Sequence, residues 1–336
     1  MKILVIRLSS LGDVVLATPA LRFLREKAPG ARIVFLTKPA FAPLLKGHPA
    51  VDEVWSFEGN GTLARVRREG FDAVLDLHGG TKSRLLSLAS GARTTRVEGY
   101  LWKRRARVWL PWLRMDSPPD VAVRGIAAAA RLLGLDPAEA SALPSLSPDP
   151  EALGWADTYL AEAGLKPGQK LLGISAGAAW ATKRWSPGYF AQAMGLLADA
   201  DKFRFLFVGD AKDRLLSDQA ISYARKGKDL AINAAGVTDT ARLAALISRC
   251  QAFLTNDSGP MHVATALGVP VVALFGPTVE FFGFFPRGPR DKVLQANLSC
   301  RPCSVHGGER CPIQTHACME MLAPFDAARA VREALA

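Results

Sequence analysis

An aspartate follows the first apolar run of the chain, in a turn that could bind an anion or supply a base. The segment Arg7-Leu-Ser-Ser-Leu-Gly-Asp13 comes directly after Ile3–Ile6 and leads into a helical pattern. A glycine-containing turn at a helix start presents backbone N–H groups to an anion. A carboxylate at that place is also a good helix cap. Its position alone makes Asp13 equally consistent with a helix cap and with a catalytic base.

A second turn of this kind, Asp257-Ser-Gly259, follows the apolar run Ala252–Thr255 and opens another helical pattern. Its backbone N–H groups and the Ser258 hydroxyl could hold phosphate oxygens, and His262 lies one helical turn beyond Ser258. An ordinary N-cap with a packed histidine would explain this turn by itself. A comparable turn, Gly276-Pro-Thr278, stands at the next strand end, and the pair favours a phosphate site.

A loop of small residues follows the predicted strand Leu171–Ile174. It contains Gly177, Ala178 and Ala179, which would allow a ligand to approach the backbone closely. Lys183 comes shortly afterwards and is placed to neutralise a diphosphate. The alternative is a surface lysine beside a tryptophan that anchors the following helix in the core.

Four cysteines stand close together near the end of the chain. Cys300 and Cys303 have the spacing of a zinc-binding pair, and Cys311 and Cys318 could complete a four-sulfur structural zinc site. The second pair has an irregular spacing, so free thiols and a redox-labile loop remain alternatives. A disulfide is not expected in a cytosolic protein.

Apolar strands alternate with helical patterns in both halves of the chain, which predicts an α/β protein with parallel sheets. The first helix is predicted over Val14–Lys27. A proline-rich stretch, Asp136–Pro150, precedes the second half. We therefore expect two Rossmann-like domains, residues 1–165 and 166–336, with a ligand cleft between them at the carboxyl ends of the strands. The last helix could pack back on the first domain.

The basic charge is concentrated in one segment. The net charge is +11, and residues 78–114 carry nine Lys or Arg against one acid, together with Trp102, Trp109 and Trp112. Interleaved Trp and Arg suit an anionic membrane or a phosphorylated lipid. Nucleic acid and a plain solvated helix are the alternatives. No apolar run reaches the ~18 residues of a spanning helix, and residues 1–8 make a poor secretory signal, so we expect a cytosolic protein.

Five stretches together resemble glycosyltransferase family 9, the ADP-heptose:lipopolysaccharide heptosyltransferases. The similarity extends from Met1 to about Met321. The stretches are MKILVIRLSSLGDVVLATPALRFLR, DLHGGTKSRLL, ISAGAAWATKRWSPGYF, TNDSGPMHVATALGVPVVALFGPT and the four-cysteine segment. The resemblance implies a GT-B architecture, with the acceptor on the first domain and an ADP-sugar donor on the second.

The resemblance also implies residue roles. Asp13 matches the general base, and Lys82 and Arg84 match a basic pair on the acceptor side. An acid expected near the donor could be Asp210 or Asp213. Contacts at Ala178 and Ala179 would come from the backbone, because some members have threonines there. The positions assigned to the donor are Gly177, Ala178, Ala179, Lys183, Asp213, Thr238, Asp257, Ser258, Gly259 and His262.

The implied reaction moves a heptose from ADP-heptose to the inner core of lipopolysaccharide, with inversion and with no required cofactor. It would take place on the cytoplasmic face of the inner membrane, where the anionic acceptor accounts for the basic segment. Two alternatives remain: a family member with another nucleotide sugar or acceptor, and a non-catalytic protein that binds nucleic acid or membrane through its basic segment. The paired turns at strand ends argue against the second, since a charge-driven binder does not need them.

Overall fold

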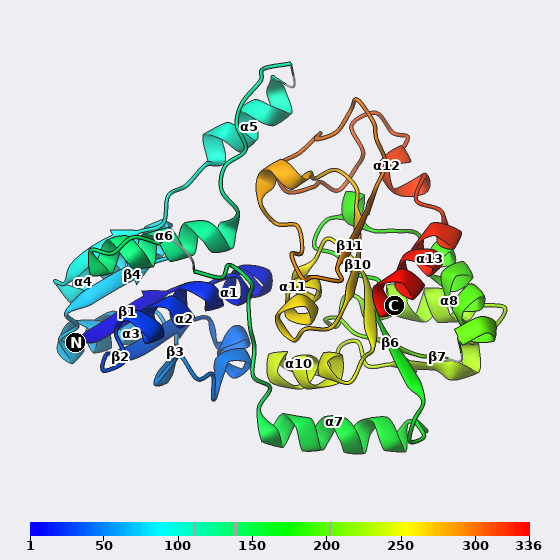
Figure 1. Cartoon of the computed structure of the whole chain (residues 1–336), viewed down its shortest axis with the longest axis horizontal. Helices are drawn as coiled ribbons and strands as arrows, with labels where there is room; N and C mark the ends of the chain where they lie inside the picture. Colours follow the sequence, from blue (N-terminus) through cyan, green and yellow to red (C-terminus); the bar gives the residue numbers. More distant parts are fainter. Residues whose placement is uncertain (111, 138–139, 202) are drawn as a thin grey trace. The chain divides into compact units, whose positions relative to one another are not determined.

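The computed structural model describes residues 1–110, 112–137, 140–201 and 203–336, which form two compact units (Figure 1). Unit 1 comprises Met1–Tyr100, Pro119–Asp149 and Asp239–Ala241. Unit 2 comprises Leu101–Pro118, Pro150–Thr238 and Arg242–Ala336. The segment 78–114, which is one basic stretch in the sequence, is therefore divided between the two units after Tyr100.

Unit 1 is built on a five-stranded parallel sheet with the order β3-β2-β1-β4-β5. Its strands are β1 (Lys2–Ile6), β2 (Arg32–Thr37), β3 (Glu53–Ser56), β4 (Ala73–Asp76) and β5 (Arg93–Arg96). The central strands are almost wholly buried, as expected for a parallel sheet with both faces covered. The edge strand β5 reads Arg-Thr-Thr-Arg and is partly exposed, so hydrophobicity does not reveal it.

Helices cover the sheet of unit 1, and four of them pack in two pairs. The helices are α1 (Leu11–Val15), α2 (Thr18–Lys27), η1 (Pro39–Leu45), α3 (Asn60–Glu69), α4 (Thr81–Ser90) and α6 (Val121–Leu133). α2 packs against α6, and α3 packs against α4. Leu4 of β1 and Val34 of β2 share a core cluster with Val66 of α3 and Leu86 of α4. The sheet therefore holds the turns at its strand ends on a rigid base.

Unit 2 is built on a six-stranded parallel sheet with the order β11-β10-β9-β6-β7-β8. Its strands are β6 (Lys170–Ser175), β7 (Phe203–Phe207), β8 (Ala231–Asn233), β9 (Ala252–Asn256), β10 (Val271–Phe275) and β11 (Lys292–Gln295). Both units thus have parallel sheets flanked by helices. The predicted α/β class with two Rossmann-like sheets is confirmed.

The remaining helices belong wholly or mainly to unit 2. They are α5 (Leu101–Trp109), α7 (Pro150–Glu162), η2 (Ala181–Lys183), α8 (Pro187–Asp201), α9 (Arg214–Tyr223), η3 (Lys228–Leu230), α10 (Thr240–Ser248), α11 (Gly259–Ala266), η4 (Glu280–Phe282), α12 (Ala317–Glu320) and α13 (Pro324–Leu335). The last helix, α13, packs against α8 and buries Ala327 and Val331 in the core of unit 2. Trp185 is also buried there, and its indole N–H donates to the Leu322 carbonyl at 3.0 Å.

The first helix differs from its prediction. A single helix over Val14–Lys27 is wrong, because α1 begins at Leu11 and α2 starts separately at Thr18. Pro19 lies in the first turn of α2 and has no N–H to continue the helix. The Thr18 hydroxyl instead donates to the Val15 carbonyl at 2.7 Å. Asp13 therefore stands inside a short helix of its own rather than in the turn that precedes a long one.

Candidate functional site

The first candidate site lies where β1 and β4 end side by side. The two strands pair in parallel, with Ile6 opposite Asp76. The chain leaves β1 toward β2 and β3 on one side, and later crosses to β4 and β5 on the other. In open parallel sheets, ligands bind outside the strand ends at this reversal. Asp13 lies in the segment that follows β1, and His78 lies in the turn that follows β4.

Asp13 is held by a set of donors at this position. Its Oδ2 accepts hydrogen bonds from the backbone N–H of Ser10 at 3.0 Å and from the Ser10 hydroxyl at 2.8 Å. Its Oδ1 forms an ion pair with the Arg7 guanidinium, which also donates to the Leu77 carbonyl. Asp13 is thus part of the N-terminal cap of α1, and its carboxylate is tied to the ends of both strands.

The charges around Asp13 favour its ionised form. Burial raises the pKa of Asp13, but the charge of Arg7 and the hydrogen bonds from Arg7 and Ser10 together lower it below its ordinary value. The carboxyl group is therefore a carboxylate throughout the neutral range, able to accept a proton or to stabilise positive charge.

Two further titratable side chains, His78 and Arg124, interact electrostatically with Asp13. Burial and the charge of Arg7 lower the pKa of His78, whose charge also interacts with Asp13. Burial lowers the pKa of Arg124 on α6, and its charge interacts with both Arg7 and Asp13. Among the described residues, no hydrogen-bond partner is found for the buried Nδ1 of His78 or the buried Nε of Arg124. Asp13 is therefore surrounded by groups suited to an anionic ligand.

The predicted acceptor residues Lys82 and Arg84 lie on α4, the helix that follows the His78 turn. Both are exposed, and the Lys82 amine lies 5.8 Å from the centroid of the Phe57 ring. Ser83 between them points inward and donates to Asp76 at 3.0 Å. None of the contacts described for unit 1 joins this pair to Asp13, so their role stays a prediction.

The second candidate site lies where β6 and β9 end side by side, with Ser175 opposite Thr255. This is the corresponding reversal in unit 2, because β7 and β8 lie on one side of β6 while β9, β10 and β11 lie on the other. The Asn256 amide joins the two loops that emerge here. It donates to the carbonyls of Ala176 at 2.9 Å and Gly177 at 3.3 Å. Two stretches predicted to bind the donor are thus adjacent.

Lys183 and Asp257 form an ion pair in unit 2. The Lys183 amine lies 2.6 Å from Asp257 Oδ2, and the two side chains are only 13% and 9% exposed. The Thr278 hydroxyl donates to the same oxygen at 2.7 Å. The interpretation of Lys183 as a plain surface lysine is therefore wrong. Three elements predicted to contact phosphate, namely η2, the turn after β9 and the turn after β10, meet at one carboxylate.

Asp213 is distinguished from Asp210 by its place. The Asp213 carboxyl group lies over Gly177 and Gly209, where an added Cβ on either glycine would collide with it. Asp210 is exposed, and its carboxylate accepts from the backbone N–H of Lys212 at 2.8 Å. Burial raises the pKa of Asp213, and the charge of Asp210 raises it further. Asp213 therefore faces the Gly177 loop, whereas Asp210 caps its own turn.

The other predicted donor residues have varied positions. Ser258 is the N-cap residue of α11 and Gly259 its first residue, while His262 is buried with its ring centroid 6.5 Å from that of Phe284. Ala178 is buried, and Ala179 is exposed. Thr238 is half-buried in the loop between β8 and α10. Their contacts to a donor stay predictions.

Comparisons with known proteins show which family the chain belongs to. The family model described as glycosyltransferase family 9 (heptosyltransferase) matches residues 62–311. The chain belongs to this family. It is 29% identical to lipopolysaccharide heptosyltransferase 2 of Escherichia coli over 302 residues, which is 84% of each chain. It is 33% identical to lipooligosaccharide heptosyltransferase 2 of Campylobacter jejuni over 163 residues, but that match spans only about half of each chain, 48% and 50%.

Solved structures of family 9 members have the same architecture. The structure of E. coli ADP-heptose lipopolysaccharide heptosyltransferase II matches with a TM-score of 0.78 and 25% identity, covering 100% of this chain and 98% of that one. A family 9 glycosyl transferase from Veillonella parvula matches with a TM-score of 0.74 and 28% identity, covering 87% and 85%. The predicted GT-B type with two Rossmann-like lobes is thereby confirmed.

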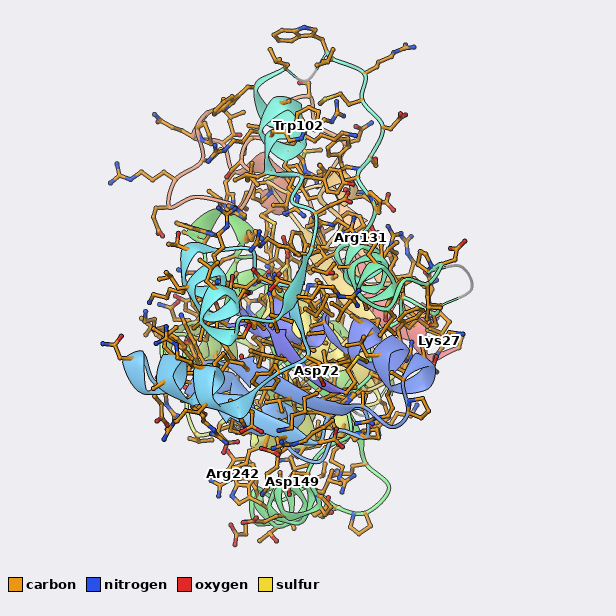
Figure 2. The ribbon with its side chains drawn as sticks, turned by 90° about the vertical axis from the view of Figure 1, so that its left-hand side faces the viewer. Lys27, Asp72, Trp102, Arg131, Asp149 and Arg242 are labelled. Atoms are coloured by element: carbon orange, nitrogen blue, oxygen red, sulfur yellow. The ribbon has the colours of Figure 1, made fainter. Side chains whose placement is uncertain are left out.

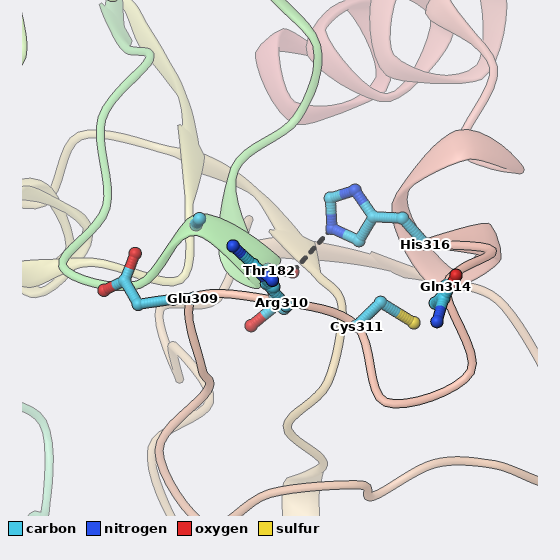
Figure 3. A pocket seen from close by; sticks show the side chains of 7 residues that line it. Thr182, Glu309, Arg310, Cys311, Gln314 and His316 are labelled. Carbon is cyan, nitrogen blue, oxygen red and sulfur yellow. Dashed lines mark hydrogen bonds between the residues drawn. The ribbon is translucent and has the colours of Figure 1, made fainter.

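In this family 9 member, the four-cysteine segment contacts the segment that follows β6. A pocket of about 510 Å³ is lined by Thr182, Cys311 and His316, among others (Figure 3). A ring nitrogen of His316 lies 2.9 Å from the Thr182 carbonyl. The Thr182 hydroxyl donates to the Gly308 carbonyl at 2.9 Å and accepts from the Gly308 N–H at 2.8 Å. The segment thus fastens η2, the element that carries Lys183.

The arrangement of these cysteines does not fit the predicted zinc site. All are free thiols, and in the described part of the chain no three His, Cys, Asp or Glu side chains are grouped so that they could hold a metal ion. Cys318 is buried in the core cluster of unit 2 on α12, and burial raises its pKa to about 11. Cys311 instead lines the pocket, where backbone N–H groups of residues 313–316 lower its pKa against the effect of burial.

Sequence reasoning missed four residues of these sites. Arg7 and His78 lie inside the motifs that predicted the site. Because each stands beside a turn at a strand end, both could have been proposed as site residues. Asn256 precedes the Asp257 turn and was read as part of it. Arg124 lies in an alanine-rich helix, and nothing in its sequence surroundings indicates that it reaches Asp13.

Proposed function

We propose that this protein transfers a heptose from ADP-heptose to the inner core of lipopolysaccharide with inversion, and that Asp13 is the general base. The names of its relatives support the substrates. The observation that carries the proposal is that each unit has a charged group at the reversal point of its sheet: the ionised, firmly held carboxylate of Asp13 in unit 1, and the Lys183–Asp257 ion pair in unit 2.

The donor would bind at the strand ends of unit 2. Its diphosphate would bind to the Lys183 amine and to the backbone N–H groups of the turn at Ser258 and Gly259. These groups stabilise negative charge without transferring a proton. The small residues of the loop at Gly177 would let the nucleotide approach the protein backbone. We assign the donor's ribose hydroxyls to Asp213 rather than Asp210, because the Asp213 carboxyl group lies over that loop.

The chemistry would follow from the charge placement. Asp13 accepts the proton of the acceptor hydroxyl while the oxygen of that hydroxyl forms a bond to the anomeric carbon of the donor sugar. The bond from that carbon to the diphosphate breaks, and ADP leaves with the electron pair through an oxocarbenium-like state. Because the pKa of Asp13 is held low, proton transfer is completed only once the attacking hydroxyl has become acidic through bond formation. Lys183 stabilises the charge that develops on the departing diphosphate.

The acceptor would bind to unit 1, and its anionic groups account for the positive side chains there. Arg7, His78 and Arg124 surround Asp13, and Lys82 and Arg84 lie on the exposed face of α4. We therefore propose acceptor binding for residues 1–165 and donor binding for residues 166–336.

We also propose that the enzyme works in the cytoplasm, at the inner face of the inner membrane where the lipid-linked acceptor is made. In the described part of the chain, no helix has the length and hydrophobicity needed to cross a bilayer.

Product analysis tests the proposal. Purified protein is incubated with ADP-heptose and a panel of truncated lipopolysaccharide acceptors, and the anomeric configuration of the product is read by NMR. A parallel panel of other nucleotide sugars, followed by nucleotide release, separates the proposal from a family member with another donor. Transfer with retention, or faster transfer from another nucleotide sugar, would refute the stated reaction.

A further inference from the structure

Helix α5 and the segment after it expose an unusual amount of bulky apolar surface. Trp102, Trp109 and Trp112 are 63%, 70% and 75% exposed, whereas most large apolar side chains of the protein are buried. Three leucines of the same stretch are also exposed: Leu101, Leu110 and Leu113. Single apolar side chains at a surface are ordinary, but a contiguous group of this size marks an interaction site.

The basic residues of α5 divide between its two faces. The guanidinium of Arg104, which is only 8% exposed, lies 4.8 Å from the centroid of the Phe284 ring. The Arg107 guanidinium lies 5.9 Å from that of Phe281. These cation–π contacts join α5 to the segment around η4. They fix which face of α5 is turned outward.

The outward face is mainly apolar, with Arg105 among its large apolar side chains. Leu101, Arg105 and Trp109 recur every four residues, so they form one line along the helix, and Trp102 lies beside it. All four are exposed. Trp102 and its helix can be followed in Figure 2. Tryptophan is suited to the boundary between water and lipid, and arginine reaches the phosphate groups found there.

A basic pocket lies on the inward side of α5, between Arg107 and the η4 segment. It has a volume of about 430 Å³ and is lined by Arg107, Arg114, Ser117 and Phe281, among others. The acid in its wall, Glu280, is paired with Arg287 at 2.8 Å. The remaining charge of the lining side chains is positive, so the pocket has the size and sign for a phosphate-bearing headgroup.

We propose that α5 and residues 112–117 dock on the surface of an anionic phospholipid bilayer. Trp102, Trp109 and Trp112 enter the interfacial region, Arg105 contacts headgroup phosphates, and the pocket at Arg107 and Arg114 takes one headgroup. This inference deepens the proposed function and rests on it for its biological purpose, since it would hold the enzyme where a lipid-linked acceptor lies.

Nucleic acid fits this region less well. Binding to a polyphosphate backbone needs many outward cations, but the basic segment 78–114 uses several of its cations internally. Arg96 pairs with the buried Asp76 at 3.0 Å, and Arg93 donates to the Leu132 carbonyl. Arg104 and Arg107 face Phe284 and Phe281. The large outward side chains of α5 are mostly apolar instead.

Vesicle cosedimentation of the full chain tests the proposal. Wild-type protein should bind vesicles that contain phosphatidylglycerol far better than pure phosphatidylcholine vesicles, and salt should weaken the binding. The double variant Trp102→Ala/Trp109→Ala should lower the partition coefficient about tenfold or more. Arg105→Gln and Arg114→Gln should each lower it about fivefold on anionic vesicles only. Phe325→Ala, which removes an aromatic side chain that is 59% exposed on α13, is the matched control and should have no effect.

A second measurement separates this inference from the proposed function. Transfer to a water-soluble core oligosaccharide without lipid should be unchanged in the tryptophan variant. If wild-type protein does not prefer anionic vesicles, or if the tryptophan variant binds them as well as wild type, the docking surface is wrong even when transfer is normal. The docking surface would likewise be wrong if wild-type protein bound an oligonucleotide but not vesicles, and if these variants lost the oligonucleotide binding. Vesicle binding without transfer would instead refute the proposed function alone.

Discussion

Asp13 and Asp257 lie at the reversal points of two sheets of the same design, but partners of different kinds hold them. Asp13 follows β1, the first strand of its sheet, whereas Asp257 follows β9, the counterpart of β4. Each follows a strand at the point where the sheet reverses its direction of growth, and each pairs with a cation. The partner of Asp13 is an arginine that is also tied to the Leu77 carbonyl. The partner of Asp257 is a lysine on the short element η2.

This difference teaches how one kind of turn can serve two purposes. Arginine has a planar fork of donors and stays where several acceptors fix it, whereas a lysine amine is a single charge on a flexible stem. Arg7 therefore keeps Asp13 ionised and in place. Under the proposed function, Lys183 would turn from Asp257 to the donor's diphosphate, and the Thr278 hydroxyl would still donate to the Asp257 carboxylate.

The largest expected effect is the loss of the fixed carboxylate. Asp13→Asn keeps the shape of the side chain but cannot accept a proton, so we expect kcat to fall about 10²–10⁴-fold. Donor affinity, measured by isothermal titration calorimetry with ADP-heptose, should be unchanged. If Asp257→Asn lowers kcat as much as Asp13→Asn does and leaves donor affinity unchanged, the proposed difference in role between the two aspartates is wrong.

Next in size is the loss of the movable cation. Lys183→Met should weaken ADP binding about 10–100-fold, because a charged hydrogen bond to phosphate contributes about 1.5–3 kcal/mol. Lys183→Arg is the control, since it keeps the charge and should bind ADP better than the methionine variant. ADP affinity equal to that of wild type in Lys183→Met would show that the lysine serves only to neutralise Asp257.

A third prediction concerns the pH dependence that Arg7 imposes. Burial raises the pKa of Asp13, whereas Arg7 and Ser10 lower it, so Arg7→Met should leave a carboxyl group with a higher pKa than in wild type. Asp13 would then become protonated at a higher pH. The acid limb of the kcat/KM profile should therefore move to higher pH than in wild type.

Two variants check the assignment of that limb. Arg25→Met removes another arginine that pairs with an aspartate of unit 1, Asp52 at 2.6 Å, and should leave the limb in place. His78 also titrates near Asp13, so the shift should persist in a His78→Gln background. A limb that does not respond to Arg7→Met would mean that Asp13 does not control it.

The smallest effect is expected from loss of the Thr278 hydroxyl, which donates a hydrogen bond to Asp257. Thr278→Val removes one hydrogen bond without changing the volume much, and a loss of about 1 kcal/mol corresponds to about a fivefold rise in the KM for the donor. Steady-state kinetics at saturating acceptor would measure it, with Thr158→Val on the exposed face of α7 as the control. An unchanged KM would leave Lys183 as the sole support for Asp257.

The sequence predicted those parts of the fold that depend on hydrophobic pattern. β1 and β6 are apolar runs followed by turns, and both were predicted with nearly correct bounds. The edge strands β5 and β11 were missed, because neither buries a continuous apolar run. Local capping was also misjudged, since the start of α1 depends on contacts among Arg7, Ser10 and Asp13 that hydrophobicity does not record.

The candidate site was predictable only where its residues stand together in the chain. The turns at Asp13 and Asp257 carry their own signal of glycine, hydroxyl and carboxylate beside a helix. The choice between Asp210 and Asp213 could not be made from the sequence, because it depends on which carboxyl group lies over Gly177. The inward direction of Arg104, on which the docking face depends, is likewise set by Phe284, 180 positions later in the numbering.

The contact between Thr182 and Gly308 has a consequence for the order in which the protein matures. These residues are separated by 126 positions, and their paired hydrogen bonds fasten the element that carries Lys183. During synthesis, the strand and loop around Lys183 leave the ribosome long before Gly308 does. A nascent chain that ends before Gly308 therefore lacks this fastening of η2. Nucleotide binding would then be acquired only near the end of translation, after unit 1 has already emerged.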